Sequence, residues 1–304
     1  MNLEGIMTAL VTPMNEQGEI IEDALRQLIT FQISKGVQSL LILGGTGEYV
    51  QLSTKERKRA IDIAVHETKG RVPVVAGIIE PGLWGSIEIS LYAKSAGADA
   101  VMLVSPYYVH PSQEGLFEYY RKVDRALGMP LVLYNIPYRT SVNVLPETVE
   151  KIVKEVPNVV AIKECTPNIA QVIDLIRRVG DKISVLSGEE FFAVTELILG
   201  AKGAIMASAN VVPEVWVTMW KLVREKRVDE AVAMNAKYFP FFQAIFRETN
   251  PGPLKAAMTM AGLSAGSVSL PLVPPSASTI EAVRKAMQDL GLPNVAPRKE
   301  GAGA

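Results

Sequence analysis

Short apolar runs rich in β-branched residues alternate with longer amphipathic segments along most of the chain. The apolar runs predict buried strands, because a strand covered on both faces is hydrophobic throughout. They cover residues 6–11, 39–43, 72–77, 100–104, 130–135, 159–164, 183–187 and 203–207. The amphipathic segments predict helices. One follows each strand in turn, over residues 22–35, 54–68, 84–96, 113–126, 146–154, 169–179, 190–199 and 216–225.

This regular alternation predicts an α/β protein, and eight strand–helix repeats fit a (β/α)8 TIM barrel. The alternative is an open, doubly wound sheet, which normally has fewer strands and a phosphate-binding loop after the first strand. The first predicted strand ends instead in Val11-Thr12-Pro13, with no glycine-rich loop. The barrel is therefore the favoured architecture.

The pattern changes after residue 226. From there on only helices are predicted, at residues 228–246, 252–261 and 276–291. We expect a barrel domain over residues 1–226, followed by a C-terminal helical extension over residues 227–293. The last segment, residues 294–304, is rich in Pro, Gly, Ala and Lys and predicts a disordered tail.

Composition narrows the function class. Of the 304 residues, 48% are hydrophobic and 21% charged, and 31 basic side chains against 32 acidic ones give a formal net charge of −1. This balance predicts no nucleic-acid partner and no membrane-surface patch. The N-terminus lacks the features of a secretory signal, the single cysteine fits a reducing compartment, and no apolar stretch approaches the roughly 20 residues of a membrane helix. We expect a soluble cytoplasmic protein.

Lys163 is the most informative residue of the chain. It follows directly on the apolar run of residues 159–162. An ammonium buried in such a strand must be paired or must lose its proton. A neutral, desolvated lysine amine is the nucleophile that forms Schiff bases with carbonyl substrates. The alternative is a lysine at the wet end of the strand, paired with an acid such as Glu164.

Two further segments lie at predicted strand ends, where the active site of a βα barrel is found. The second strand leads into Gly44-Gly45-Thr46-Gly47-Glu48, whose backbone amides can form a nest for a carboxylate, with the Thr46 hydroxyl as a further donor. The fifth strand ends at Tyr134, a phenol able to shuttle protons, and Arg139 follows as a partner for a carboxylate. Taken singly, these features would predict a flexible turn, a core tyrosine and a surface arginine. Their coincidence with Lys163 favours an active site.

The sequence offers few ligands for a metal ion. His66 falls in a helical pattern and His110 in a loop, so no metal site is predicted. An aldol-type enzyme with this sequence would therefore depend on the lysine as its electrophilic catalyst. Cys165, next to that lysine, is expected to pack as a small hydrophobic residue.

Four segments together resemble the dihydrodipicolinate synthase and N-acetylneuraminate lyase superfamily. They are residues 44–48, residues 107–108 with 111–115, residues 134–140 and residues 162–164. The resemblance extends over nearly the whole chain apart from the C-terminal tail. It implies a βα barrel with C-terminal helices, usually a homotetramer built as a dimer of dimers. It also implies a small-molecule enzyme that uses pyruvate and an aldehyde through a Schiff base, without metal or cofactor.

The resemblance assigns the catalytic roles by position. It implies that Lys163 forms the imine, that Tyr134 shuttles protons, and that Tyr108 reaches into a neighbouring subunit's site to complete its proton relay. Arg139 and the pair Lys163-Glu164 resemble the synthase branch of the superfamily. That branch condenses pyruvate with aspartate 4-semialdehyde.

The resemblance also assigns the binding roles. Thr46 and the amides around Gly45 and Gly47 would hold the pyruvate carboxylate, which makes Thr46 part of the catalytic relay as well. Arg139 would bind the carboxylate of the second substrate. The backbone carbonyl of Ile205 would line the site.

The chain also departs from the synthase pattern, which leaves alternatives open. Synthases typically have a threonine where this chain has Gly45, and sugar-acid dehydratases and aldolases resemble the form found here. An enzyme acting on 2-keto-3-deoxy sugar acids is therefore the first alternative. A pyridoxal phosphate enzyme that uses Lys163, and a catalytically silent keto-acid sensor, are two others. Lysine-inhibited synthases have His, Asn and Glu where this chain has Arg57, Pro81 and Gly85, so feedback by lysine is not expected.

Overall fold

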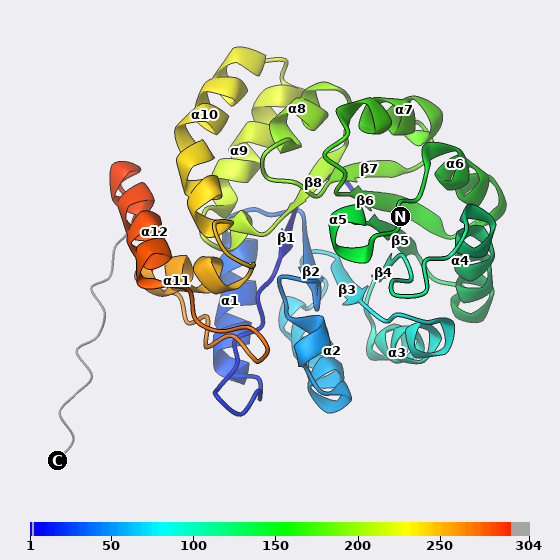
Figure 1. The fold of residues 1–304 in the computed structure, drawn as a ribbon, viewed down its shortest axis with the longest axis horizontal. Coiled ribbons are helices and arrows are strands. Elements are labelled where there is room, and N and C mark those ends of the chain that lie inside the picture. The colour runs from blue at the N-terminus through cyan, green and yellow to red at the C-terminus, as the bar shows by residue number, and fades with distance from the viewer. Residues whose placement is uncertain (2, 293–304) are drawn as a thin grey trace.

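The structure is a computed structural model that describes residue 1 and residues 3–292. Within that range, eight parallel strands close into a barrel in chain order, with a ring of helices around it (Figure 1). The strands are β1 (Gly5–Ala9), β2 (Ser39–Ile42), β3 (Val74–Ile78), β4 (Ala100–Val104), β5 (Leu131–Asn135), β6 (Val159–Glu164), β7 (Ser184–Ser187) and β8 (Gly203–Met206). Each overlaps its predicted range, so the predicted (β/α)8 barrel is confirmed.

The helices also follow the predicted order, with short additions at the strand ends. Around the barrel lie α1 (Glu22–Ser34), α2 (Thr54–Thr68), α3 (Leu83–Ala96), α4 (Gln113–Leu127), α5 (Pro137–Thr140), α6 (Pro146–Glu155), α7 (Ile169–Val179), α8 (Ala193–Ile198) and α9 (Pro213–Arg224). The short helix α5 and the 3-10 turns η1 (Tyr49–Gln51) and η2 (Ser208–Asn210) were not predicted. All three belong to the connections that follow strands, where a few residues carry no periodic signal.

The C-terminal helices pack beside the barrel. They are α10 (Val228–Ile245), α11 (Gly252–Met260) and α12 (Ala277–Asp289), and Figure 1 shows them grouped on the side of α1 and α9. The predicted domain boundary at residue 226 falls between α9 and α10 and stays a prediction. The predicted disordered tail lies outside the described residues. No helix in the described part of the chain is both long and apolar enough to cross a membrane.

Polar side chains at helix starts explain several of these boundaries. The Ser53 side chain accepts a hydrogen bond from the Glu56 amide at the start of α2 (3.2 Å), and Ser112 does the same for Gly115 at the start of α4 (3.2 Å). Such caps satisfy backbone donors that have no partner inside the helix. They make the helix starts readable from the sequence.

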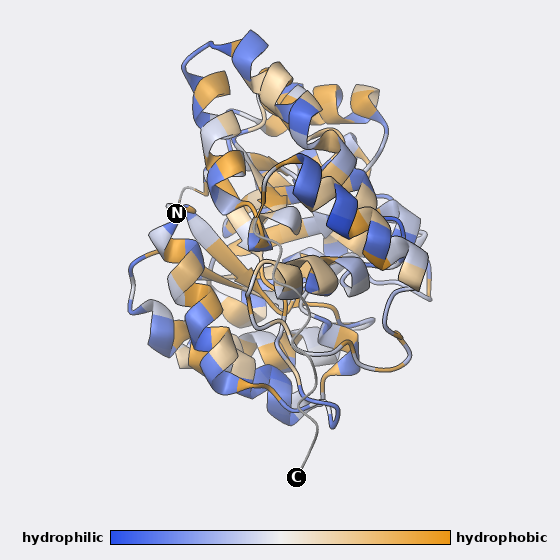
Figure 2. Cartoon of the chain, turned by 90° about the vertical axis from the view of Figure 1, so that its left-hand side faces the viewer, coloured by the Kyte–Doolittle hydropathy of each residue, from blue (hydrophilic) through white to orange (hydrophobic). Residues whose placement is uncertain are grey.

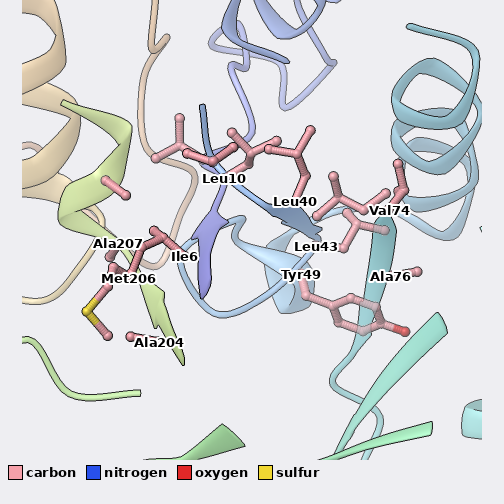
Figure 3. Close-up of a cluster of buried hydrophobic side chains, with 14 of the residues drawn as sticks. Ile6, Leu10, Leu40, Leu43, Tyr49, Val74, Ala76, Ala204, Met206 and Ala207 are labelled. Atoms are coloured by element: carbon pink, nitrogen blue, oxygen red, sulfur yellow. The ribbon is translucent and has the colours of Figure 1, made fainter. Parts of the chain in front are cut away.

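Strand alternation builds two hydrophobic cores. Successive residues of a strand point to opposite faces. Ile6, Leu40 and Val74 belong to the cluster between the sheet and the helices, part of which Figure 3 shows. Their neighbours Met7 and Leu41 belong to the cluster that fills the barrel interior. In Figure 2 the central strands are mostly hydrophobic, while hydrophilic residues gather on the surrounding helices.

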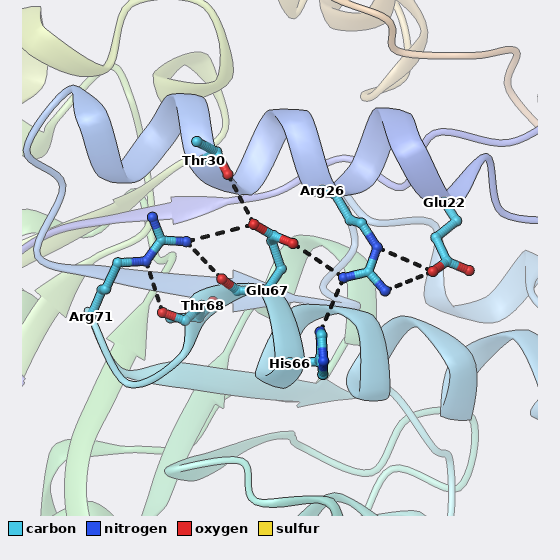
Figure 4. A network of polar contacts seen from close by, with 7 residues as sticks. All are labelled: Glu22, Arg26, Thr30, His66, Glu67, Thr68 and Arg71. Carbon is cyan, nitrogen blue, oxygen red and sulfur yellow. Dashed lines mark hydrogen bonds and ion pairs between the residues drawn. The ribbon is translucent and has the colours of Figure 1, made fainter.

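Partly exposed charges join the outer faces of α1 and α2 (Figure 4). Arg26 binds Glu22 (2.7 Å) one turn away on α1 and Glu67 (3.1 Å) on α2. The Glu67 carboxylate also accepts a hydrogen bond from the Thr30 hydroxyl (3.2 Å). Ion pairs this exposed contribute little to stability, because solvent screens the charges and the long side chains lose freedom. The network supports helix packing but does not determine the fold.

A buried ion pair connects the C-terminal helices to the loop after β2. Lys255 on α11 lies 2.6 Å from the carboxylate of Glu48, and both side chains are almost completely buried. The Lys255 ammonium also donates to the backbone carbonyls of Thr12 (2.9 Å) and Ser267 (2.7 Å). Burial lowers the pKa of Lys255, and the facing Glu48 carboxylate opposes that shift. The pair therefore holds the glycine-rich loop, residues 44–48, against α11.

We expect Lys255→Met to lower the free energy of unfolding by about 3–5 kcal/mol, because it leaves Glu48 buried without its counter-charge. Urea denaturation at neutral pH measures the change. Arg227→Met is the matched control, since the Arg227 pair with Glu230 is exposed and its attraction is screened by solvent. Equal stability of the two variants would show that the buried pair contributes no more than a surface pair.

Candidate active site

The structure brings Lys163 and Tyr134 together at the C-terminal ends of β6 and β5. The two residues are register partners in the parallel pairing of these strands. Both line the same cavity, and the Lys163 Nζ lies 4.6 Å from the centroid of the Tyr134 ring. Val132 and Ala161, two residues earlier on each strand, belong to the interior cluster, as alternation requires.

Lys163 is buried without a counter-ion. The residue is only 7% exposed, and its ammonium forms no ion pair or hydrogen bond with any residue in the described ranges. Glu164, the alternative partner considered from the sequence, accepts instead from the Asn135 side-chain amide (2.9 and 3.0 Å) and the Thr166 amide (2.8 Å). Because adjacent strand residues face opposite sides, Glu164 points away from the amine.

Gly188, directly after β7, makes room for Cys165 and Lys163. A Cβ at this position would overlap Cys165 Sγ and would lie 2.9 Å from Lys163 Cε and 3.1 Å from the Glu164 carbonyl oxygen. Any side chain here would displace the cysteine, the lysine stem or the backbone at the end of β6. No local signal in the sequence marks this glycine, because its contacts are with a neighbouring strand rather than with its own turn.

The cavity around Lys163 has a volume of about 70 Å³. Six of the eight residues named from the sequence line it: Gly45, Thr46, Tyr134, Arg139, Lys163 and Ile205. The loop after β2, the start of α5 and the ends of β5, β6 and β8 supply these residues. Side chains from distant parts of the chain therefore converge on a space that suits a three-carbon acid.

Gly47 and Tyr108 do not line this cavity. A Cβ on Gly47 would lie 3.0 Å from the Leu43 amide nitrogen and 3.1 Å from the Leu10 carbonyl oxygen, so the glycine is needed for close backbone packing. Tyr108 has a positive φ of 72° and is 86% exposed in the single chain. Their predicted roles in substrate binding and in the relay stay predictions.

The C-terminal helices contribute a side chain that the sequence analysis missed. The Asn250 side-chain amide donates to the Thr46 hydroxyl oxygen (2.9 Å), across 204 positions of sequence. Because that oxygen already accepts, the Thr46 hydrogen is left to donate into the cavity. Nothing local in the sequence connects Asn250, which lies just before α11, to Thr46.

A second cavity of about 240 Å³ adjoins the first and shares Gly45, Tyr134 and Arg139 with it. One wall is built by Tyr49, whose hydroxyl donates to Glu80 (2.7 Å) while the Arg57 guanidinium stacks on its ring at 4.0 Å. Arg57 also pairs with Glu80 at 2.6 Å. Arg57 is therefore fully engaged within the chain. The expected absence of lysine feedback stays a prediction.

Burial changes the acid–base behaviour of several groups around the cavity. It raises the pKa of Tyr134 well above its ordinary value, although the charge of Arg139 opposes this, and it does the same to the Cys165 thiol. Tyr134 therefore remains protonated at neutral pH and Cys165 remains an unreactive thiol. Burial also raises the pKa of Glu164 and of Glu189 to about 7.

The described residues contain no group of three or more His, Cys, Asp and Glu side chains arranged to hold a metal ion.

Comparison with known proteins agrees with this geometry. The profile of the dihydrodipicolinate synthetase family matches residues 2–290. A 4-hydroxy-tetrahydrodipicolinate synthase from Syntrophus aciditrophicus is 40% identical over 289 residues, which cover 95% of this chain and 99% of that protein.

Solved structures match over the same length. A dihydrodipicolinate synthase from Aquifex aeolicus has a TM-score of 0.94 at 34% identity, covering 97% of this chain and 100% of that one. A chloride-inhibited dihydrodipicolinate synthase from Acinetobacter baumannii, complexed with pyruvate, has a TM-score of 0.92 at 34% identity, covering 96% and 100%. The chain belongs to the dihydrodipicolinate synthetase family.

Proposed function

We propose that this protein is a 4-hydroxy-tetrahydrodipicolinate synthase, which condenses pyruvate with aspartate 4-semialdehyde. The observation that carries the proposal is the buried, unpaired Lys163 amine beside the Tyr134 ring. Relatives about 40% identical over nearly the whole chain are named for this activity, and one similar structure is a complex with pyruvate. A biosynthetic enzyme of this kind is expected to act in the cytoplasm.

The first stage is formation of an imine on Lys163. The Lys163 nitrogen attacks the ketone carbon of pyruvate through its lone pair, while the pyruvate carboxylate accepts from the Thr46 hydroxyl and from amides of the glycine-rich loop. The Asn250 contact supports this orientation of the hydroxyl. Tyr134, held in its protonated form by burial, gives a proton to the departing water.

The second stage forms the carbon–carbon bond. The protonated imine withdraws electrons, so a proton passes from C3 of the bound pyruvate to the Tyr134 oxygen, which gave up its own in the first stage, and an enamine results. The enamine carbon attacks the aldehyde of the second substrate, which we place in the adjoining 240 Å³ cavity with its carboxylate on Arg139. The amine of that substrate then displaces Lys163 and closes the ring.

An aldolase or dehydratase of 2-keto-3-deoxy sugar acids remains the alternative. It is favoured by Gly45, which leaves the cavity without the hydroxyl found there in typical synthases. Parallel assays with aspartate 4-semialdehyde plus pyruvate and with 2-keto-3-deoxygluconate distinguish the two activities.

We further propose that the protein assembles as a homotetramer in which Tyr108 enters a partner's site. Several large apolar side chains are exposed in the single chain, among them Trp84 on α3, Tyr108 and Val109 in the loop after β4, and Ile173 and Ile198 on α7 and α8. Burial of such side chains between subunits would favour assembly, and a dimer of dimers needs two different isologous interfaces.

Lys163→Ala is expected to abolish the covalent attachment of pyruvate that borohydride reduction leaves on the wild-type protein, because no other amine lines the cavity in the described residues. Mass spectrometry of the intact protein measures the added mass. The control is Lys182→Ala, which replaces an exposed lysine just before β7. Lys255→Ala would be unsuitable, because it disturbs folding. Trapping at the wild-type level in Lys163→Ala contradicts the assignment.

Tyr134→Phe is expected to lower kcat by about 10²–10⁴-fold, which is the usual contribution of a well-placed acid–base group. Imine formation with pyruvate should slow in parallel, since the same hydroxyl serves the dehydration step. Stopped-flow and steady-state assays give the two rates. An unchanged kcat would remove Tyr134 from the mechanism.

Tyr108→Phe and Lys163→Ala are each expected to be nearly inactive, yet randomly mixed subunits should recover about a quarter of wild-type activity. Half of the randomly formed pairs are mixed, and each mixed pair contains one intact site of two, so about a quarter of all sites are intact. Co-refolding the two variants and measuring turnover tests this. Recovery no greater than that of Lys163→Ala mixed with itself would show that Tyr108 acts within its own chain or not at all.

A further inference from the structure

Two adjacent carboxylates at the end of β7 line the cavity, and the mechanism above uses neither. Glu190 Oε1 accepts from the backbone amides of Ala207 (2.6 Å) and Ser208 (3.0 Å). These bonds hold the turn that contains Glu190 against the end of β8. The helix α8 therefore begins at Ala193 and not at residue 190, where the sequence predicts its start. Glu190 is therefore a structural acceptor. Glu189 differs, because its Oε1 is buried and has no hydrogen-bond partner among the described residues.

Charged and titratable groups surround Glu189 on several elements. They are Tyr134 on β5, Tyr138 and Arg139 on α5, Lys163 and Cys165 at the end of β6, Glu190 beside it and Glu196 on α8. Burial raises the pKa of the Glu189 carboxyl to about 7, while the Tyr138 hydroxyl and the charges of Lys163 and Arg139 limit the rise. The group can therefore both hold and release a proton near neutral pH.

The second substrate of the proposed reaction carries two charges on one carbon, a carboxylate and an ammonium. Arg139 would bind the carboxylate, and no residue named so far would bind the ammonium. Arg139 and Glu189 line the same cavity and interact electrostatically. A guanidinium beside a carboxylate is complementary to an amino acid head group.

We propose that Glu189 is a catalytic residue that binds the ammonium of the amino-aldehyde substrate and removes a proton from it. This rests on the proposed function. Other groups lining the cavity suit the task less well. Glu190 is occupied by backbone amides, and burial keeps Tyr134 and Cys165 protonated at neutral pH. An ammonium must lose a proton before its nitrogen can attack, so the ring cannot close without such an acceptor.

The step balances without any further reactant. One proton passes from the substrate ammonium to the Glu189 carboxylate, which frees the nitrogen lone pair. The nitrogen bonds to the iminium carbon, a second proton moves from this nitrogen to the Lys163 nitrogen, and the bond between that carbon and Lys163 breaks. Lys163 leaves as a neutral amine and the product leaves as a protonated cyclic imine. Glu189 returns to its carboxylate by giving its proton to solvent.

The experiment compares Glu189→Gln and Glu189→Asp with the wild-type protein and with Asp181→Asn. Asp181 is an exposed acid at the opposite end of β7, so its variant controls for loss of one negative charge. Two aldehydes are used after pyruvate: aspartate 4-semialdehyde, and succinate 4-semialdehyde, which has the same chain without the amine. Borohydride trapping with pyruvate alone, the mass of the trapped succinate semialdehyde adduct, and steady-state turnover are measured for each variant.

We expect Glu189→Gln to trap pyruvate and the succinate semialdehyde adduct at wild-type levels, which also shows that it folds. Its kcat/KM for aspartate 4-semialdehyde should fall by about 10²-fold or more, with partial recovery in Glu189→Asp. In the wild-type protein kcat/KM should decline as the pH falls below 7, because protonation neutralises Glu189, and Glu189→Gln should lack this limb. Asp181→Asn should match the wild-type protein throughout.

Unchanged turnover in Glu189→Gln, or an equal loss with both aldehydes, would overturn this inference while leaving the Schiff-base mechanism standing. Absence of pyruvate trapping in the wild-type protein would overturn the proposed function itself. The two failures are therefore distinguishable.

Discussion

The pairing of β5 with β6 in a closed parallel barrel is the constraint on which the site depends. Tyr134 and Lys163 are register partners, and both point inward, so the phenol and the amine meet in a space that the other strands enclose. A slip of one residue in either strand would turn one of the two side chains toward the helices. Val132 and Ala161, two residues earlier on the same strands, also point into the barrel. The alternation that separates the two hydrophobic cores therefore also turns Tyr134 and Lys163 toward the cavity.

The C-terminal helices complete the site from outside the barrel. The Lys255–Glu48 ion pair holds the glycine-rich loop against α11, and Asn250 donates a hydrogen bond to Thr46 in the same loop. A loop rich in glycine has little conformational preference of its own, so its geometry must be imposed by such contacts. The chain after residue 226 therefore supplies part of the cavity wall, through Phe246 and Asn250.

Burial at the C-terminal end of the barrel raises the pKa values of neighbouring groups, with a different consequence for each. Tyr134 is kept protonated, as a donor should be, while Glu189 is brought into the range where it exchanges protons at neutral pH. The positive charges of Lys163 and Arg139 act against the desolvation of Glu189. One cavity can therefore present both a proton donor and a proton acceptor at neutral pH.

The sequence by itself determined the strand and helix order and pointed to Lys163, Tyr134 and Arg139, because periodicity and strand-end position are local properties. Only the tertiary structure decided which groups surround them. Asn250 reaches Thr46 across 204 positions, and Glu189 meets the lysine only because β6 and β7 pair in parallel. Such contacts arise from strand pairing in the barrel and from the packing of the C-terminal helices beside it, and no local pattern of side chains encodes them.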